Sequence, residues 1–77
     1  MAEFQAHNRI ERDPSVMVGK PIVKGTRITV EHILRDLSSG MSVAEIVDAY
    51  PRLVAEDVGA AVAYAADCLA CEGLVSV

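Results

Sequence analysis

The sequence of 77 residues contains no tryptophan, one phenylalanine and two tyrosines, so aromatic side chains contribute little to any core. It also lacks a long apolar run, because charged residues interrupt every hydrophobic stretch before the roughly 18 residues that suggest a membrane helix. The N-terminal residues do not have the basic-then-apolar order of a signal peptide. We therefore expect a cytoplasmic protein with no membrane segment.

Cysteine is scarce: Cys68 and Cys71 form a single C-x-x-C pair. A structural zinc site needs four ligands, and neither His7 nor His32 has a metal-like spacing to the pair. A redox C-x-x-C obtains its reactive thiolate at a helix N-terminus, whereas this pair closes a predicted helix. We interpret the two cysteines as small buried thiols, and we predict no metal and no cofactor.

Positive charge is nearly absent from the second half of the chain. Residues 36–77 carry one cation, Arg52, against seven acids, whereas residues 1–35 carry six cations against four acids. Such polarity concerns partners rather than fold. It predicts that the front half makes any contact with the phosphates of operator DNA. The candidate DNA-binding residues are Lys20, Lys24, Arg27 and Arg35.

The pattern along the chain predicts one small, mainly α-helical domain over residues 1–77. Short β-branched runs at 16–18, 22–23 and 27–29 predict short strands or a hairpin. Apolar residues at helical spacing then predict three helices in a helix-turn-helix-like, homeodomain-like bundle. We expect an extended lead-in at 1–15, strands at 16–29, helices at 30–71 and a tail at 72–77.

The segment GKPIVKGTRITV, residues 19–30, resembles a phosphate-binding loop only superficially. Such a loop places a lysine and a hydroxyl directly after its second glycine. Here Gly25 is followed by Thr26 and Arg27. Glycine supplies positive φ, and proline fixes φ while removing a donor. We therefore interpret Gly19, Pro21 and Gly25 as structural turn residues, and we expect no small-molecule substrate.

Helix boundaries are marked clearly. Thr29 is a predicted N-cap of the first helix, and Gly40 occupies the left-handed position beyond its end. Ser42 and Glu45 form a predicted capping box for the second helix, which Pro51 stops. The third helix is expected over about residues 55–71.

The third helix is apolar on two faces. One stripe is the predicted core face, formed by Val58, Ala61, Val62, Ala65 and Leu69. Its other sides carry small side chains instead of polar ones, which suggests burial by a second chain; an alanine-rich helix tolerated at the surface is the alternative. We therefore predict a homodimer or higher homo-oligomer. The predicted protein-interface residues are Gly59, Ala63, Tyr64, Ala66, Ala70 and Leu74.

The same helix is a poor candidate for a groove-binding recognition helix, although a tight turn precedes it. Recognition helices present Arg, Lys, Asn or Gln near their N-terminus, whereas this one begins with Glu56 and Asp57. An enzyme is not expected either. No nucleophile–base pair is evident, and His32 has no plausible partner in the sequence.

The chain resembles the family called domain of unknown function 433 over about residues 8–70. The glycine-rich G-K-P and G-T-R-I strings are the most specific part. The residues that carry the resemblance are Asp13-Pro14, Gly19-Lys20-Pro21-Ile22, Gly25-Thr26-Arg27-Ile28, Val30, Gly40-Met41-Ser42, Glu45-Ile46, Tyr50-Pro51, Leu53, Asp57, Ala60-Ala61 and Tyr64-Ala65.

This resemblance implies a trihelical helix-turn-helix domain preceded by short strands. It further implies an antitoxin of the VapB kind, which neutralises a PIN-like ribonuclease toxin by direct binding and is able to repress the shared operon. A DNA-binding regulator without a toxin is the alternative. The chain departs from the family pattern at Val54, where a capping Ser or Thr is usual, so we expect a less well capped third helix.

Overall fold

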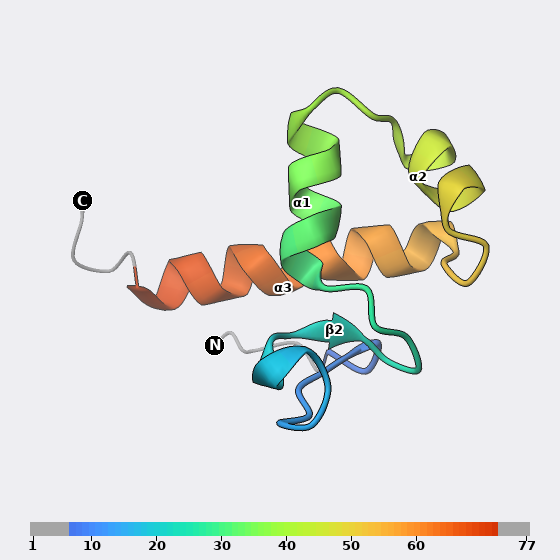
Figure 1. The fold of residues 1–77 in the computed structure, drawn as a ribbon. Helices are drawn as coiled ribbons and strands as arrows, with labels where there is room; N and C mark the ends of the chain where they lie inside the picture. Colours follow the sequence, from blue (N-terminus) through green and yellow to red (C-terminus); the bar gives the residue numbers. More distant parts are fainter. Residues whose placement is uncertain (1–6, 73–77) are drawn as a thin grey trace.

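The computed structural model describes residues 7–72, in which a two-stranded antiparallel sheet precedes three α-helices (Figure 1). The strands are β1 (Ile10–Glu11) and β2 (Ile22–Val23), with Ile10 opposite Val23. The helices are α1 (Val30–Ser38), α2 (Val43–Ala49) and α3 (Ala55–Glu72). This is the small, mainly α-helical fold predicted from the sequence. None of the described helices is long and apolar enough to cross a membrane.

The first strand is not where the sequence predicted it. A strand at residues 16–18 is wrong: Met17–Gly19 form a 3-10 turn, in which Met17 and Val18 have φ values of 50° and 55°. Asp13 starts this reversal, because its carboxylate accepts hydrogen bonds from the backbone N–H and the hydroxyl of Ser15. Such local bonds compete with strand pairing. The partner of β2 comes instead from the predicted lead-in, residues 10–11.

Two glycines shape the loops around β2. Gly19 and Gly25 adopt φ values of +80° and +82°, the left-handed region that glycine enters without steric cost. Thr26 closes the loop after β2: its hydroxyl donates to the carbonyl of Val23 and accepts from the N–H of Ile28. The predicted strand at 27–29 is reduced to an isolated bridge between Ile22 and Thr29.

The predicted caps of the first two helices are confirmed. The Thr29 hydroxyl accepts from the N–H of His32 at 3.0 Å. Ser42 and Glu45 form a complete capping box, with bonds of 2.8 and 3.1 Å. Gly40, at φ +102°, reverses the chain after α1. These ends depend on neighbours in sequence, so the sequence is sufficient to predict them.

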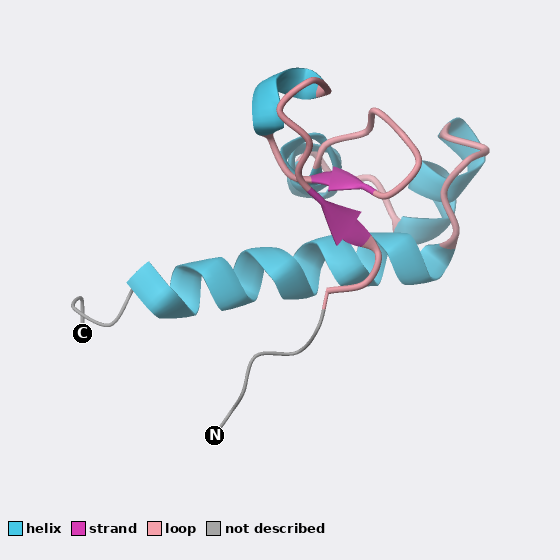
Figure 2. Ribbon diagram, turned by 90° about the horizontal axis from the view of Figure 1, so that it is seen from below, coloured by secondary structure: helices cyan, strands magenta, loops and turns pink. Residues whose placement is uncertain are grey.

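The core gathers where the three helices meet the sheet. It is built from one or two apolar side chains of each element, and β1 packs against α3 (Figure 2). The fully buried side chains are Ile22, Ile33, Ile46, Leu53, Val58 and Ala61.

The predicted core stripe of α3 is therefore only partly right. Val58 and Ala61 are buried, but Val62 is 43% and Leu69 65% exposed. The helix α1 stands across α3 instead of lying along it (Figures 1 and 2), so it covers only the part of α3 near the crossing. The C-terminal half of α3 runs past this crossing (Figure 1), where little of the bundle can cover it.

Candidate interaction surfaces

An apolar groove lies between α1 and the C-terminal half of α3. We call it the α1/α3 groove; its volume is about 560 Å³. Its edge carries Lys20, Glu31, Arg35 and Ser38. The remaining lining is formed by Pro21, Val30, Leu34, Tyr64, Ala65, Cys68 and Leu69.

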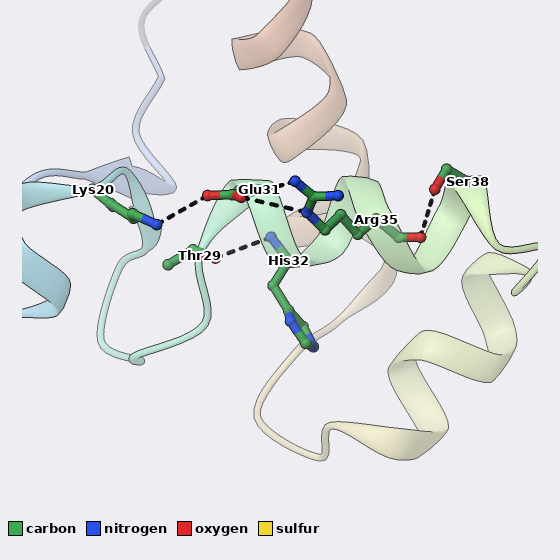
Figure 3. Close-up of polar contacts among 6 residues, drawn as sticks. All are labelled: Lys20, Thr29, Glu31, His32, Arg35 and Ser38. Carbon is green, nitrogen blue, oxygen red and sulfur yellow. Dashed lines mark hydrogen bonds and ion pairs between the residues drawn. The ribbon is translucent and has the colours of Figure 1, made fainter.

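Ion pairs organise the edge of this groove. Glu31 accepts from Lys20 Nζ at 3.1 Å and from Arg35 Nη2 at 3.3 Å (Figure 3). The hydrogen bond from Lys20, followed by its charge, holds the pKa of Glu31 below the usual value. The Arg35 side chain is 76% exposed. Two of the four predicted DNA-binding residues thus share one carboxylate, which leaves a net single positive charge at the edge.

The other two predicted DNA-binding residues lie elsewhere, at the loop after β2. Lys24 and Arg27 are exposed, and within residues 7–72 neither forms an ion pair. Arg52, from the turn between α2 and α3, joins them: its guanidinium donates to the carbonyl of Gly25 at 3.0 Å. We call Lys24, Arg27 and Arg52 the cationic turn. Sequence reasoning missed Arg52, because nothing local links residue 52 to residue 25.

The face of α3 opposite the groove is bordered by the chain's own N-terminal segment. His7 Nε2 lies 2.8 Å from Asp67 Oδ2, and the His7 ring meets Tyr64 edge-on at 5.2 Å. A hollow of about 580 Å³ separates this segment from the small residues Ala63 and Ala66.

The predicted interface residues do not all lie on one surface. Ala63 and Ala66 line the hollow, and Gly59 and Ala70 are exposed on α3. Tyr64 instead lines the α1/α3 groove. Leu74 lies outside the described residues.

Both cysteines are exposed, so the prediction of two buried thiols is wrong. They lie on the part of α3 that runs past the crossing with α1 (Figure 1), where neighbouring elements do not cover it. Cys68 lines the groove beside Tyr64. Burial of Tyr64, together with the neighbouring Cys68, raises the pKa of the phenol. Among the described residues, no three His, Cys, Asp or Glu side chains gather as a metal site requires.

His32 has a partner, contrary to the sequence-based expectation. Its Nε2 lies 2.6 Å from the Tyr50 hydroxyl and 3.6 Å from Asp36 Oδ2. Burial, and then the charge of Asp36, raise the pKa of Tyr50. Figure 3 shows His32 projecting away from Glu31 and Arg35. The contact ties α1 to the end of α2.

The start of α3 is also better capped than expected. Asp57 Oδ2 accepts from the N–H of Val54 at 3.0 Å, and Asp57 Oδ1 accepts from Arg9 Nη1 at 3.0 Å. Asp57 is only 7% exposed. Its position three residues after Val54, where a capping box has its acidic member, was the available sequence signal. Of the two acids at this helix start, only Glu56 faces solvent.

Comparison with known proteins places the chain in a family. The family model described as "Protein of unknown function (DUF433)" matches residues 10–65. The chain belongs to this family. The resemblance expected from the G-K-P and G-T-R-I strings is thereby confirmed. The matched residues include both strands, α1, α2 and the first part of α3, whereas Cys68, Leu69 and Cys71 follow the matched range.

Two similar proteins illustrate the relationship. A crystal structure of a DUF433 member from Anabaena variabilis ATCC 29413 is 35% identical, with a TM-score of 0.71 over 74% of this chain and 56% of that one. The uncharacterized protein y4eO of Sinorhizobium fredii is 33% identical over 60 residues, or 78% of this chain. The match spans only 27% of the length of y4eO.

Proposed function

We propose that this chain is the antitoxin of a type II toxin–antitoxin pair, which binds and neutralises a PIN-like ribonuclease toxin. The α1/α3 groove is the observation that carries the proposal. It combines a largely apolar lining with an exposed Leu69 at one side and cations at its edge. Apolar surface rimmed by polar residues is typical of protein-binding sites.

The charges at the edge of the groove suit a nuclease. PIN-like ribonucleases carry spaced aspartates, which present an acidic surface. Lys20 and Arg35 share Glu31, so one positive charge at the edge stays uncompensated by it. Opposite potentials steer association and select the partner. Arg35 is the more exposed of the two cations and the better placed to reach a partner's carboxylates.

The test is coexpression with the PIN-like nuclease that this proposal expects in the neighbouring reading frame. The wild-type chain should restore growth of cells that express the nuclease, and it should bind a catalytically inactive form of that nuclease in calorimetry. Arg35→Glu should weaken binding by about tenfold or more, because it reverses a charge at the edge of the groove. Lys24→Glu is the matched control, since Lys24 lies outside the groove.

Two results would contradict the proposal. If the wild-type chain neither restores growth nor binds the nuclease, the antitoxin function is wrong. If Lys24→Glu abolishes binding while Arg35→Glu leaves it intact, the groove is not the toxin site.

A DNA-binding regulator without a toxin partner is the second candidate function. The cationic turn favours it, because Lys24, Arg27 and Arg52 come together there without an acidic partner among the described ion pairs. The start of α3 does not favour contacts with base edges in the major groove of DNA. Asp57 is engaged with Arg9, and Glu56 offers no hydrogen-bond donor to bases.

A further inference from the structure

The C-terminal half of α3 presents an exposed apolar side chain next to the α1/α3 groove. Leu69 is the most exposed large apolar side chain of the described α-helices, at 65%. It also forms part of the wall of the α1/α3 groove, a space of about 560 Å³. The exposed Leu69 side chain and the groove therefore belong to one continuous surface.

Such a surface can be complementary to itself. A two-fold axis presents the same patch on both copies, so each copy has to supply both halves of every contact. Here each copy offers an exposed Leu69 and an apolar groove next to it. Pairing two copies across this patch buries both leucines at once.

The distribution of charge also favours a second copy of this chain as the occupant of the groove. The C-terminal half of α3, residues 64–72, contains two acids, Asp67 and Glu72, and no lysine or arginine; Asp67 pairs with His7. Its C-terminal end also carries the negative pole of the helix dipole. The edge of the groove has a net positive charge from Lys20 and Arg35, which Glu31 only half offsets. The negative end of one α3 thus meets the positive edge of the other copy.

We propose that the α1/α3 groove seats the C-terminal half of α3 from a second copy of this chain, giving a two-fold homodimer in the absence of toxin. This proposal assigns the interface to the groove instead of the small-residue face with Ala63, which His7 and Arg9 border in the chain itself. One consequence rests on the proposed function: if the toxin binds the α1/α3 groove, the toxin and the second copy compete for it.

The first experiment is sedimentation velocity of the purified chain alone, at about 10 to 200 µM. The wild type should be a dimer in this range. Leu69→Glu should weaken dimerisation by about thirtyfold or more, as loss of a central apolar anchor does. Ala63→Glu and Val43→Glu are matched controls that add the same charge on the other face of α3 and on α2, and both should stay dimeric.

The other outcomes overturn the proposal. A monomeric wild type, or a Leu69→Glu variant that stays dimeric, contradicts it. So does loss of the dimer in Ala63→Glu, which would assign the interface to the small-residue face. Leu69 is mostly exposed, so circular dichroism should show that Leu69→Glu still folds. Because no toxin is present, none of these results bears on the antitoxin function.

A second measurement locates the interface without relying on that variant. Cys68 lines the groove, and in a Cys71→Ser background it is the only thiol. Its alkylation by iodoacetamide should slow severalfold as the protein concentration passes the dimerisation midpoint. Adding Leu69→Glu should remove this dependence. An alkylation rate that is independent of concentration in a protein shown to dimerise places the interface elsewhere.

Discussion

Replacing Asp57 by alanine removes two interactions from the start of α3. The carboxylate accepts from the N–H of Val54 and from Arg9, each at 3.0 Å, and it is 7% exposed. Loss of a helix cap costs about 1 kcal/mol. The pair with Arg9 adds about 1 kcal/mol at most, because the Arg9 side chain is 48% exposed and partly hydrated.

The expected cost of Asp57→Ala is therefore about 2 kcal/mol in the free energy of unfolding. For a chain of this size, that corresponds to a fall in thermal midpoint of about 8–16 °C. Urea unfolding followed by circular dichroism measures the change. All variants should be compared at one protein concentration, since self-association would otherwise shift the midpoint.

Two further variants separate the two interactions. Arg9→Met removes only the ion pair, and it should cost about 1 kcal/mol or less. Asp57→Asn keeps an acceptor for the N–H of Val54, so it should cost less than alanine. The two roles assigned to Asp57 are wrong if Asp57→Ala lies within about 0.5 kcal/mol of the wild type. The capping role is wrong if Arg9→Met costs as much as Asp57→Ala, because the cap would then contribute nothing.

Two other predictions concern the loop after β2. Gly25→Val should lower stability by about 1 kcal/mol or more, because φ is +82° and a Cβ there meets no atom within 4 Å, so backbone strain is the whole cost; an unchanged thermal midpoint would show that this glycine is not required. Replacing Lys24, Arg27 and Arg52 by glutamine should weaken operator binding for all sequences alike and flatten its salt dependence by about 0.9 for each phosphate that is no longer neutralised. Binding that keeps its salt slope contradicts the cationic turn as the DNA site, and no binding at low salt removes the regulator function.

The sequence was a reliable guide wherever neighbours along the chain decide the outcome. Thr29 caps a helix three residues ahead, and Ser42 and Glu45 cap each other across the same short span. The family was evident for a similar reason, because its G-K-P and G-T-R-I strings are local. The strands were less predictable, since the turn at Asp13 competes with the β-branched run that follows it.

The candidate surfaces depended on interactions that no local pattern encodes. His7 meets Asp67 across 60 residues, Arg9 meets Asp57 across 48, and Arg52 meets the carbonyl of Gly25 across 27. The sequence itself shows that six of the seven cations lie in the front half. It could not show that Glu31 pairs with two of them, Lys20 and Arg35, while Arg52 joins two others, Lys24 and Arg27.

By itself, the sequence determined the family, the mainly α-helical fold and the helix caps of α1 and α2, because each follows from residues within a few positions of one another. Tertiary structure alone decided where α1 crosses α3, and this leaves the C-terminal half of α3 uncovered (Figures 1 and 2). This arrangement exposes Leu69, which helical periodicity had assigned to the core, and Cys68 and Cys71, which were interpreted as buried thiols. Periodicity identifies an apolar face, but whether that face is buried depends on how far the neighbouring elements extend to cover it.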